Sequence, residues 1–128
     1  MSRKSKGINA ERDLVHKFWK LGWASVRIAG SGSMKYPSAD ILATNKIRRL
    51  AVECKTSSDK SKYLTKDEVK QLKDFSTIFG AEPWIAVKFD RCEWLFMNID
   101  DLKHTGNNFL ISLDIAEKKG LLLDELIK

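Results

Sequence analysis

The sequence lacks long apolar runs and is poor in cysteine, and each absence removes a class of protein. No stretch of the 128 residues approaches the roughly 20 apolar residues of a membrane span, and the N-terminal MSRKSKG lacks the apolar core of a secretion signal. The two cysteines, Cys54 and Cys92, have neither CxxC nor zinc-type spacing. We therefore expect reduced thiols in a cytoplasmic protein with no membrane partner.

Several common catalytic patterns are also missing. The sequence contains no Ser–His–Asp arrangement, no phosphate-cradling glycine loop and no zinc pattern, which argues against serine hydrolases, ATPases and zinc fingers. His16 lies about 140° around a predicted helix from Glu11, and His104 falls in a predicted polar loop. We assign neither histidine a role.

Positive charge is abundant. The chain has 23 Lys and Arg against 17 Asp and Glu, a net charge of +6, and its pI is about 9.4. Such a balance in a small protein favours a polyanionic partner, most often nucleic acid. The length suits one domain with an ordinary hydrophobic core.

Hydrophobic periodicity predicts an α/β fold, a mixed sheet with helices packed against it. Helices are predicted over 8–21 and 66–79, and Thr65 and Glu68 have the spacing of a capping box before the second. Strands are predicted over 23–29, 40–44, 49–55, 83–89 and 92–99, with hairpins across Asn45–Lys46 and Asp90–Arg91.

The remaining segments have weaker patterns. Residues 1–7 are predicted to be a mobile basic arm, and residues 8–128 a single domain. A polar link over 56–63, a loop over 100–108, a short strand over 109–113 and a helical segment over 121–127 complete the prediction.

The strand LAVECKTSS, residues 50–58, carries two charges on one face. Glu53 and Lys55 are two positions apart, so their side chains leave the same face about 6.6 Å from each other. A solvated pair at a sheet edge is the ordinary explanation. Two further acids favour a different one.

Asp40 opens the preceding strand, and a hairpin would bring it to the end of the sheet where Glu53 lies. Glu11 falls within the apolar stripe of the first helix. Because an unpaired buried carboxylate costs several kcal/mol, such a residue is usually paired or metal-bound. Its ion-pair partner could lie near Arg12, or be Arg27 or Lys55.

These residues suit metal-assisted hydrolysis of a phosphodiester. Mg²⁺ takes oxygen ligands, which Asp40, Glu53 and the backbone carbonyl of Cys54 would supply, and Mn²⁺ should substitute for it. The ion activates a bound water and neutralises phosphate charge. Lys55 could orient or deprotonate that water, or stabilise the oxyanion.

The motif SAD at 38–40 followed by ECK at 53–55 resembles the signature of PD-(D/E)xK nucleases, with serine or alanine in place of the first proline. Three further stretches, AERDLV, VRIAGSGS and DFSTIFGAEPWIAVKF, extend the resemblance to the archaeal Holliday junction resolvase family over nearly the whole chain. The resemblance implies a restriction-endonuclease-like fold. Cys54 departs from the small aliphatic residue usual inside the motif.

The resemblance also implies residue roles. Glu11, Asp40, Glu53 and Lys55 would be catalytic, with the three acids as metal ligands, and Ser31 would lie near the scissile phosphate, although Ser33 is an alternative. Arg12 and Arg27 match basic positions near the DNA backbone. The family further implies a homodimer whose two sites cut opposing strands of a four-way junction.

Two larger sets are predicted to bind partners. The DNA-contact residues are basic and lie in the arm, loops or helix starts: Arg3, Lys4, Lys6, Arg12, Arg27, Lys35, Lys60 and Lys62. The dimer-face residues are aromatic: Phe75, Phe79, Trp84 and Trp94, for each of which a core position is the alternative.

We therefore expect a Mg²⁺-dependent endonuclease that resolves four-way junctions in recombination and repair, associated with the nucleoid. The alternatives are a related nuclease acting on flap, nicked or modified duplex DNA, and an inactive DNA-binding module. A sliding clamp or branch-migration helicase would be a sensible protein partner.

Overall fold

A computed structural model describes residues 2–33 and 35–128. The chain forms two compact units, and the first contains the residues up to Glu53 together with Gln71–Pro83. The second unit contains Cys54–Lys70 and Trp84–Lys128. Within the described residues, no helix is both long and apolar enough to cross a membrane.

Helix α1 (Arg3–Lys20) opens the first unit and begins five residues before the predicted start. Ser2 explains the difference, because its side chain accepts a hydrogen bond from the Ser5 N–H and caps the helix. Residues 3–7 are therefore helical, and the prediction that the first helix starts at residue 8 was wrong. Leu14 and Phe18 are buried, and the helix ends before Gly22, whose φ of +84° suits a glycine.

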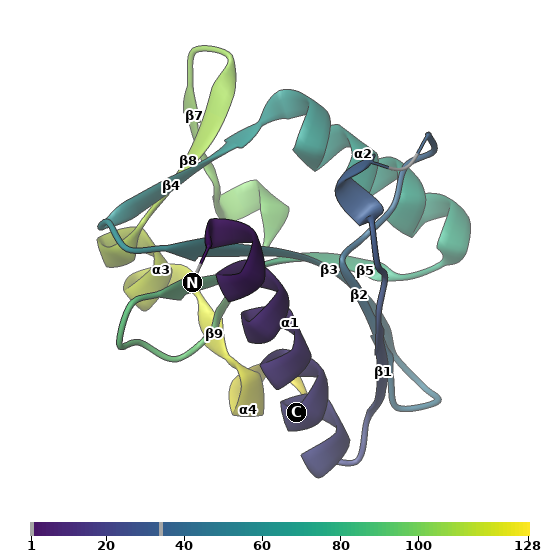
Figure 1. Cartoon of the computed structure of the whole chain (residues 1–128). Helices are drawn as coiled ribbons and strands as arrows, with labels where there is room; N and C mark the ends of the chain where they lie inside the picture. Colours follow the sequence, from purple (N-terminus) through teal and green to yellow (C-terminus); the bar gives the residue numbers. More distant parts are fainter. Residues whose placement is uncertain (1, 34) are drawn as a thin grey trace. The chain divides into compact units, whose positions relative to one another are not determined.

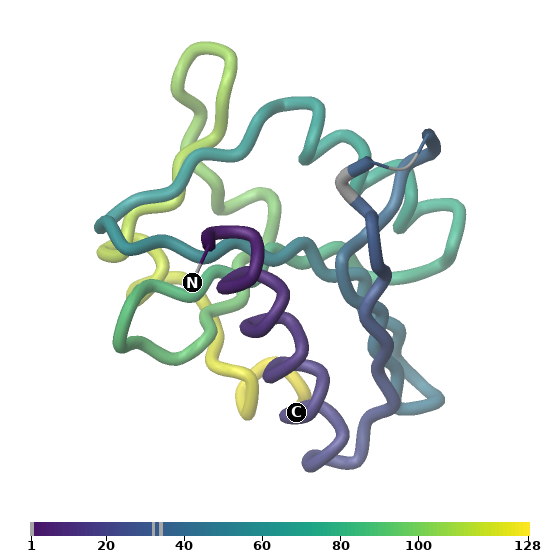
Figure 2. The backbone as a smooth tube through the Cα atoms, in the orientation of Figure 1, coloured from purple at the N-terminus to yellow at the C-terminus, as the bar shows by residue number. Residues whose placement is uncertain are grey.

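The sheet of the first unit has the order β1-β2-β3, and both pairs are antiparallel. Its strands are β1 (Ala24–Arg27), β2 (Ile41–Thr44) and β3 (Arg49–Ser57), and β3 continues into the second unit. The chain descends through α1 and returns along β1 beside it (Figure 2), and the Ser25 hydroxyl donates to the Val15 carbonyl of α1. This packing buries alternate residues of β2, Ile41 and Ala43, and three consecutive residues of β3, Leu50, Ala51 and Val52.

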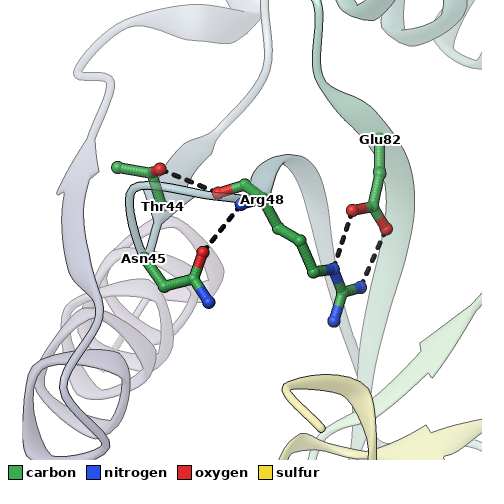
Figure 3. A network of polar contacts seen from close by, with 4 residues as sticks. All are labelled: Thr44, Asn45, Arg48 and Glu82. Atoms are coloured by element: carbon green, nitrogen blue, oxygen red, sulfur yellow. Dashed lines mark hydrogen bonds and ion pairs between the residues drawn. The ribbon is translucent and has the colours of Figure 1, made fainter.

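The predicted hairpin between β2 and β3 is confirmed, with Thr44 opposite Arg49. Figure 3 shows how its turn is built. Asn45 Oδ1 accepts from the backbone N–H of Arg48, and the Thr44 hydroxyl donates to the Arg48 carbonyl. The Arg48 guanidinium then binds both carboxylate oxygens of Glu82, at 2.9 and 2.8 Å. This two-point contact fixes the turn against the start of β5 (Glu82–Phe89).

Helix α2 (Lys66–Phe79) has the predicted bounds and the predicted capping box. The Glu68 N–H donates to the Thr65 hydroxyl at 3.0 Å, and Glu68 Oε1 accepts from the Thr65 N–H at 2.9 Å. Gly80, with φ +80°, ends the helix and donates to the Ser76 carbonyl. The helix begins in the second unit and ends in the first.

In the second unit the strand order is β3-β5-β6-β9, where β6 is Leu95–Met97 and β9 is Leu121–Leu122. The predicted hairpin across Asp90–Arg91 is confirmed by the antiparallel pairing of β5 with β6. The predicted last helix was partly wrong, because β9 precedes a short helix, α4 (Leu123–Leu126).

A second sheet in this unit has the order β4-β8-β7, and Figure 1 shows its β7–β8 hairpin as two strands joined by a tight turn. The strands are β4 (Ser61–Thr65), β7 (Lys103–Thr105) and β8 (Asn108–Ser112). The strand predicted over 109–113 is confirmed as β8, but β4 and β7 fall in segments predicted as link and loop. Local pattern missed β4 because it pairs with β8, a partner almost fifty residues later.

Two shorter elements complete the second unit. Helix α3 (Leu113–Lys119) was not predicted; its cap is the Ser112 hydroxyl, which accepts from the Ile115 N–H. The short helix η2 (Ile99–Asp101) covers the last residue of the strand predicted over 92–99 and the start of the segment predicted as a loop.

Candidate active site

The four predicted catalytic residues lie on or directly beside three elements. Glu11 lies on α1, Asp40 directly precedes β2, and Glu53 and Lys55 stand two positions apart on β3. Glu11, Asp40 and Glu53 belong to the first unit, whereas Lys55 belongs to the second.

The backbone of Asp40 is held by hydrogen bonds on both sides. Its N–H donates to the Val52 carbonyl at 2.9 Å, and its carbonyl accepts from the Ile28 N–H at 2.8 Å. Val52 immediately precedes Glu53, so the β2–β3 hairpin brings the Asp40 backbone beside the start of the ECK motif. The expectation that a hairpin brings the two acids to one end of the sheet is confirmed at the level of the backbone.

The glycine–serine loop supplies a hydroxyl to this acid. Ser31, in the short helix η1 (Ser31–Ser33), donates from Oγ to Asp40 Oδ1 at 2.5 Å. Ser33 instead donates to the Gly30 carbonyl at 3.2 Å. Of the two serines, Ser31 is the one that contacts a predicted metal ligand.

Glu11 forms an ion pair across α1 and β1. Its Oε1 lies 3.6 Å from Nη1 of Arg27, and both side chains are more than four-fifths buried. Arg27 was one of the partners considered from the sequence. Burial raises the pKa of the Glu11 carboxyl, the negative charge of Asp40 raises it further, and the ion pair and hydrogen bond with Arg27 lower it in part.

The acids fit a divalent cation by their chemistry. Glu11 and Asp40 are close enough to repel each other, and carboxylate oxygens are the ligands that hard cations prefer. A cation between them would remove this repulsion. Across residues 2–33 and 35–128, no group of three or more His, Cys, Asp or Glu side chains converges tightly enough to define a metal site. The ligand set with Glu53 therefore stays a proposal.

Lys55 has a partner that the sequence reasoning missed. Its ammonium group forms an ion pair with Oε2 of Glu68, the capping-box residue of α2. The capping spacing pointed to Glu68 as a helix residue, and no local signal connected it with Lys55, thirteen positions earlier. Cys54 and Cys92 are thiols and form no disulfide.

The predicted DNA-contact residues differ in exposure. Arg3, Lys4, Lys6 and Arg12 are exposed along α1, and Lys4 stands two helical turns before Glu11, on the same side of the helix. In the loops, Lys35 and Lys60 are exposed. Lys62 and Arg27 are partly buried, and Arg27 is engaged by Glu11.

The predicted dimer-face residues also divide. Phe79 is 48% exposed and stacks on Phe75, with ring centroids 5.2 Å apart. Trp84 is partly buried. Trp94 is only 2% exposed, so its inclusion in the dimer face was wrong. It belongs to the core of the second unit because it directly precedes the fully enclosed strand β6.

Comparisons with known proteins agree with one another. The sequence model of the family described as "Archaeal holliday junction resolvase (hjc)" matches residues 2–128. The crossover junction endodeoxyribonuclease Hjc of Archaeoglobus fulgidus is 42% identical over 129 residues, covering 95% of each chain. The corresponding protein of Methanocaldococcus jannaschii is 37% identical over 133 residues, covering 95% of this chain and 96% of its own.

A solved structure gives the same answer for the fold. The 1.6 Å structure of the Holliday junction resolvase Hjc from Archaeoglobus fulgidus matches with a TM-score of 0.88 and 39% identity, covering 93% of this chain and 96% of that one. The predicted restriction-endonuclease-like α/β fold is thus confirmed. Sequence, family pattern and fold coincide over the same residues, and the chain belongs to the archaeal Holliday junction resolvase family.

Proposed function

We propose that this protein is a structure-selective endodeoxyribonuclease that resolves four-way DNA junctions during recombination and repair. The observation that carries the proposal is the acid cluster of the first unit. Asp40 is fixed by Ile28, Val52 and Ser31, and its negative charge acts on the largely buried carboxylate of Glu11. A protein that only bound DNA would gain little from buried acids beside the DNA phosphates. Membership of the archaeal Holliday junction resolvase family supports a four-way junction as the substrate.

Glu11, Asp40, Glu53 and the Cys54 carbonyl would hold Mg²⁺, with Mn²⁺ as a substitute. The ion would supply an acidified water and neutralise charge on the scissile phosphate. The Ser31 hydroxyl orients the Asp40 carboxylate by its hydrogen bond, and Arg27 holds Glu11 in place and favours its ionised form. These contacts belong to the chain itself and are made before any substrate arrives.

Lys55 would act on the nucleophile or on the phosphate. It follows Glu53 by two positions, so both side chains leave the same face of β3. An ammonium group there can orient or deprotonate the attacking water, or stabilise the developing oxyanion.

The exposed cations of α1 offer a phosphate-binding surface beside the acids. Lys4 lies about 10 Å along the helix from Glu11, from a rise of 1.5 Å per residue. Arg3, Lys6, Arg12, Lys35, Lys60 and Lys62 would add further contacts. Their charge fixes the DNA in position without reading its sequence, as expected for an enzyme that recognises branch shape.

Two active sites are needed for paired cuts, so we propose a homodimer. The first unit carries an apolar groove of about 220 Å³ lined by Trp19, Val26, Leu42 and Phe79, among others. Trp19 and Val26 are more than half exposed, and Ile78 is 88% exposed. This surface, with Phe75 behind Phe79, is the proposed dimer face. The enzyme would work at the nucleoid, where a sliding clamp or branch-migration helicase could deliver junctions.

The deciding experiment is cleavage of a synthetic immobile four-way junction, with linear duplex and flap controls, with and without Mg²⁺. Symmetric cuts on opposing strands that require the metal are the expected result. Cleavage of flap or duplex in preference to the junction would move the protein to a related nuclease class. Tight junction binding with no cleavage would leave a DNA-binding module and overturn the proposal.

A further inference from the structure

Glu68 divides its carboxylate between two tasks. Oε1 accepts from the Thr65 N–H at 2.9 Å and so completes the capping box of α2. Oε2 forms the ion pair with Lys55 on β3. All three residues belong to the second unit. The residue that starts the helix therefore also holds the lysine of the ECK motif.

The capping box fixes the position of this carboxylate. The Glu68 N–H donates to the Thr65 hydroxyl at 3.0 Å, so Glu68 is bound through its backbone as well as its side chain. It also lies in the first turn of α2, where the helix dipole favours negative charge. Because the cap restrains the Glu68 carboxylate, its position determines where the Lys55 ammonium group lies when the two form their ion pair.

The pair is largely withdrawn from water. The side chains of Lys55 and Glu68 are 20% and 31% exposed. Burial alone would raise the pKa of the Glu68 carboxyl, but hydrogen bonds from Lys55 and Thr65 outweigh it and lower the pKa. Glu68 thus stays ionised and supplies the counter-charge that a dehydrated ammonium group needs.

We propose that Glu68 is a positioning residue for Lys55, which it holds by charge and geometry in the place from which the lysine serves cleavage. The N-terminus of α2 thereby becomes part of the catalytic apparatus without touching the substrate. The inference rests on the proposed nuclease function, in which Lys55 is catalytic. It adds the residue and the helix that place it.

The test compares two substitutions of Glu68 in single-turnover cleavage of a four-way junction by saturating protein. Glu68→Gln keeps an oxygen for the Thr65 N–H but loses the charge facing Lys55, so the cap survives and the ion pair does not. We expect the rate to fall about tenfold, and up to about 100-fold for Glu68→Ala, the range typical of residues that orient a catalytic group. Junction affinity should stay within about twofold of the wild type, because the substitution removes no positive charge.

A cap control and a double variant separate positioning from general stability. Ser112→Ala removes the cap of α3 in the same unit and leaves Lys55 and Glu68 intact, so it should lower the melting temperature without the rate loss. In a Lys55→Met background, Glu68→Gln should cause no further loss, because its effect passes through the lysine. Multiplicative losses in the double variant would overturn the inference, as would a wild-type rate for Glu68→Gln.

A readout without DNA or metal tests the contact itself. Mass spectrometry can follow the acylation of Lys55 by an amine-reactive reagent, with exposed Lys118 as an internal reference. Loss of the carboxylate should speed acylation of Lys55 several-fold while leaving Lys118 unchanged, and equal rates in both proteins would overturn the inference. A wild-type protein that cuts no DNA would overturn the proposed function and the catalytic inference with it. A cutting wild type with an equally fast Glu68→Gln would overturn the inference alone.

Discussion

The hydroxyl of Ser31 donates a hydrogen bond to Oδ1 of Asp40 over 2.5 Å. It ties the glycine–serine loop to the residue that opens β2. Such bonds set the direction in which a carboxylate presents its remaining lone pairs. The loop therefore acts on the proposed metal site through Asp40.

Removing this hydroxyl should slow cleavage without preventing it. We expect Ser31→Ala to lower the single-turnover rate about 10- to 100-fold, as for other residues that orient a metal ligand. Ser33→Ala is the matched control and should remain close to wild type, because Ser33 bonds only to the backbone of its own loop among the contacts described here. Equal losses in the two variants would point to the loop fold rather than to the Asp40 contact.

Replacing Asp40 itself should abolish cleavage while preserving binding. Asp40→Asn keeps the side-chain shape and removes a charge that would face phosphate, so we expect a loss of more than about 100-fold in rate. The affinity for a junction, measured by gel shift without metal, should be equal or tighter. Wild-type-like cleavage by this variant would eliminate the proposed metal site.

Mg²⁺ should stabilise the protein through the same acids. A ligand that binds only the folded chain adds about 2.7 kcal/mol at 100 times its Kd, so the melting temperature should rise with Mg²⁺. Glu53→Gln should weaken this rise. Asp114→Asn, which alters an exposed pair with Lys118 in α3, should retain it. An equal Mg²⁺ response in all three proteins would exclude Glu53 as a ligand.

The raised pKa of Glu11 predicts a pH-dependent stability difference. A folded-state pKa above the ordinary value of 4.5 means that the folded chain binds this proton more tightly than the unfolded chain. Ionised Glu11 therefore costs stability, absent below about pH 4.5 and complete once the pH exceeds the raised pKa. Without metal, Glu11→Gln should melt at or above the wild-type temperature at pH 7, and this advantage should disappear in acid.

Asp13→Asn provides the comparison for Glu11. Asp13 lies on the same helix and pairs with Lys17 at an exposed site. Its substitution should neither raise the melting temperature at pH 7 nor make the difference from wild type depend on pH. If Glu11→Gln instead destabilises the protein at pH 7, the ion pair with Arg27 outweighs burial and the repulsion by Asp40.

Charge on the first turns of α1 should control the salt dependence of binding. Replacing Arg3, Lys4 and Lys6 together by alanine preserves helix propensity and removes three cations. If all three contact phosphate, the slope of log K against log salt should become shallower by about 2.7. Lys118→Ala with Lys119→Ala, at the end of α3, is the control; an unchanged slope in the α1 variant would remove this helix from the DNA-binding surface.

The proposed dimer face can be tested by size. A carboxylate at Phe79 would be dehydrated at an apolar interface, so Phe79→Asp should shift the protein from dimer to monomer in light scattering. Ile47→Asp alters an exposed isoleucine of the β2–β3 turn, outside the proposed face, and should leave the protein dimeric. A wild-type monomer, or a dimeric Phe79→Asp, would contradict this face.

Local rules were sufficient where neighbours in sequence decide the structure. The bounds of α2 follow from Thr65, Glu68 and Gly80, and the two hairpins follow from short turns between strands. By contrast, β4 and β8 pair over a long sequence separation, and neither strand has a strong pattern by itself. Helix α1 also begins before its apolar stripe, at the cap supplied by Ser2. Hydrophobic periodicity did not show this start, because the cap is a single hydrogen bond of a polar side chain.

The candidate site divides along the same line. By itself, the sequence determined the residue types and the motif: Asp40, Glu53 and Lys55 at nuclease spacing, with Glu11 in an apolar stripe. Only the tertiary structure decided which groups meet, namely Ser31 rather than Ser33 at Asp40, Arg27 at Glu11, and Glu68 at Lys55. Spacing and periodicity act along the chain, whereas a hydrogen bond or ion pair depends on ångström distances between side chains that folding brings together.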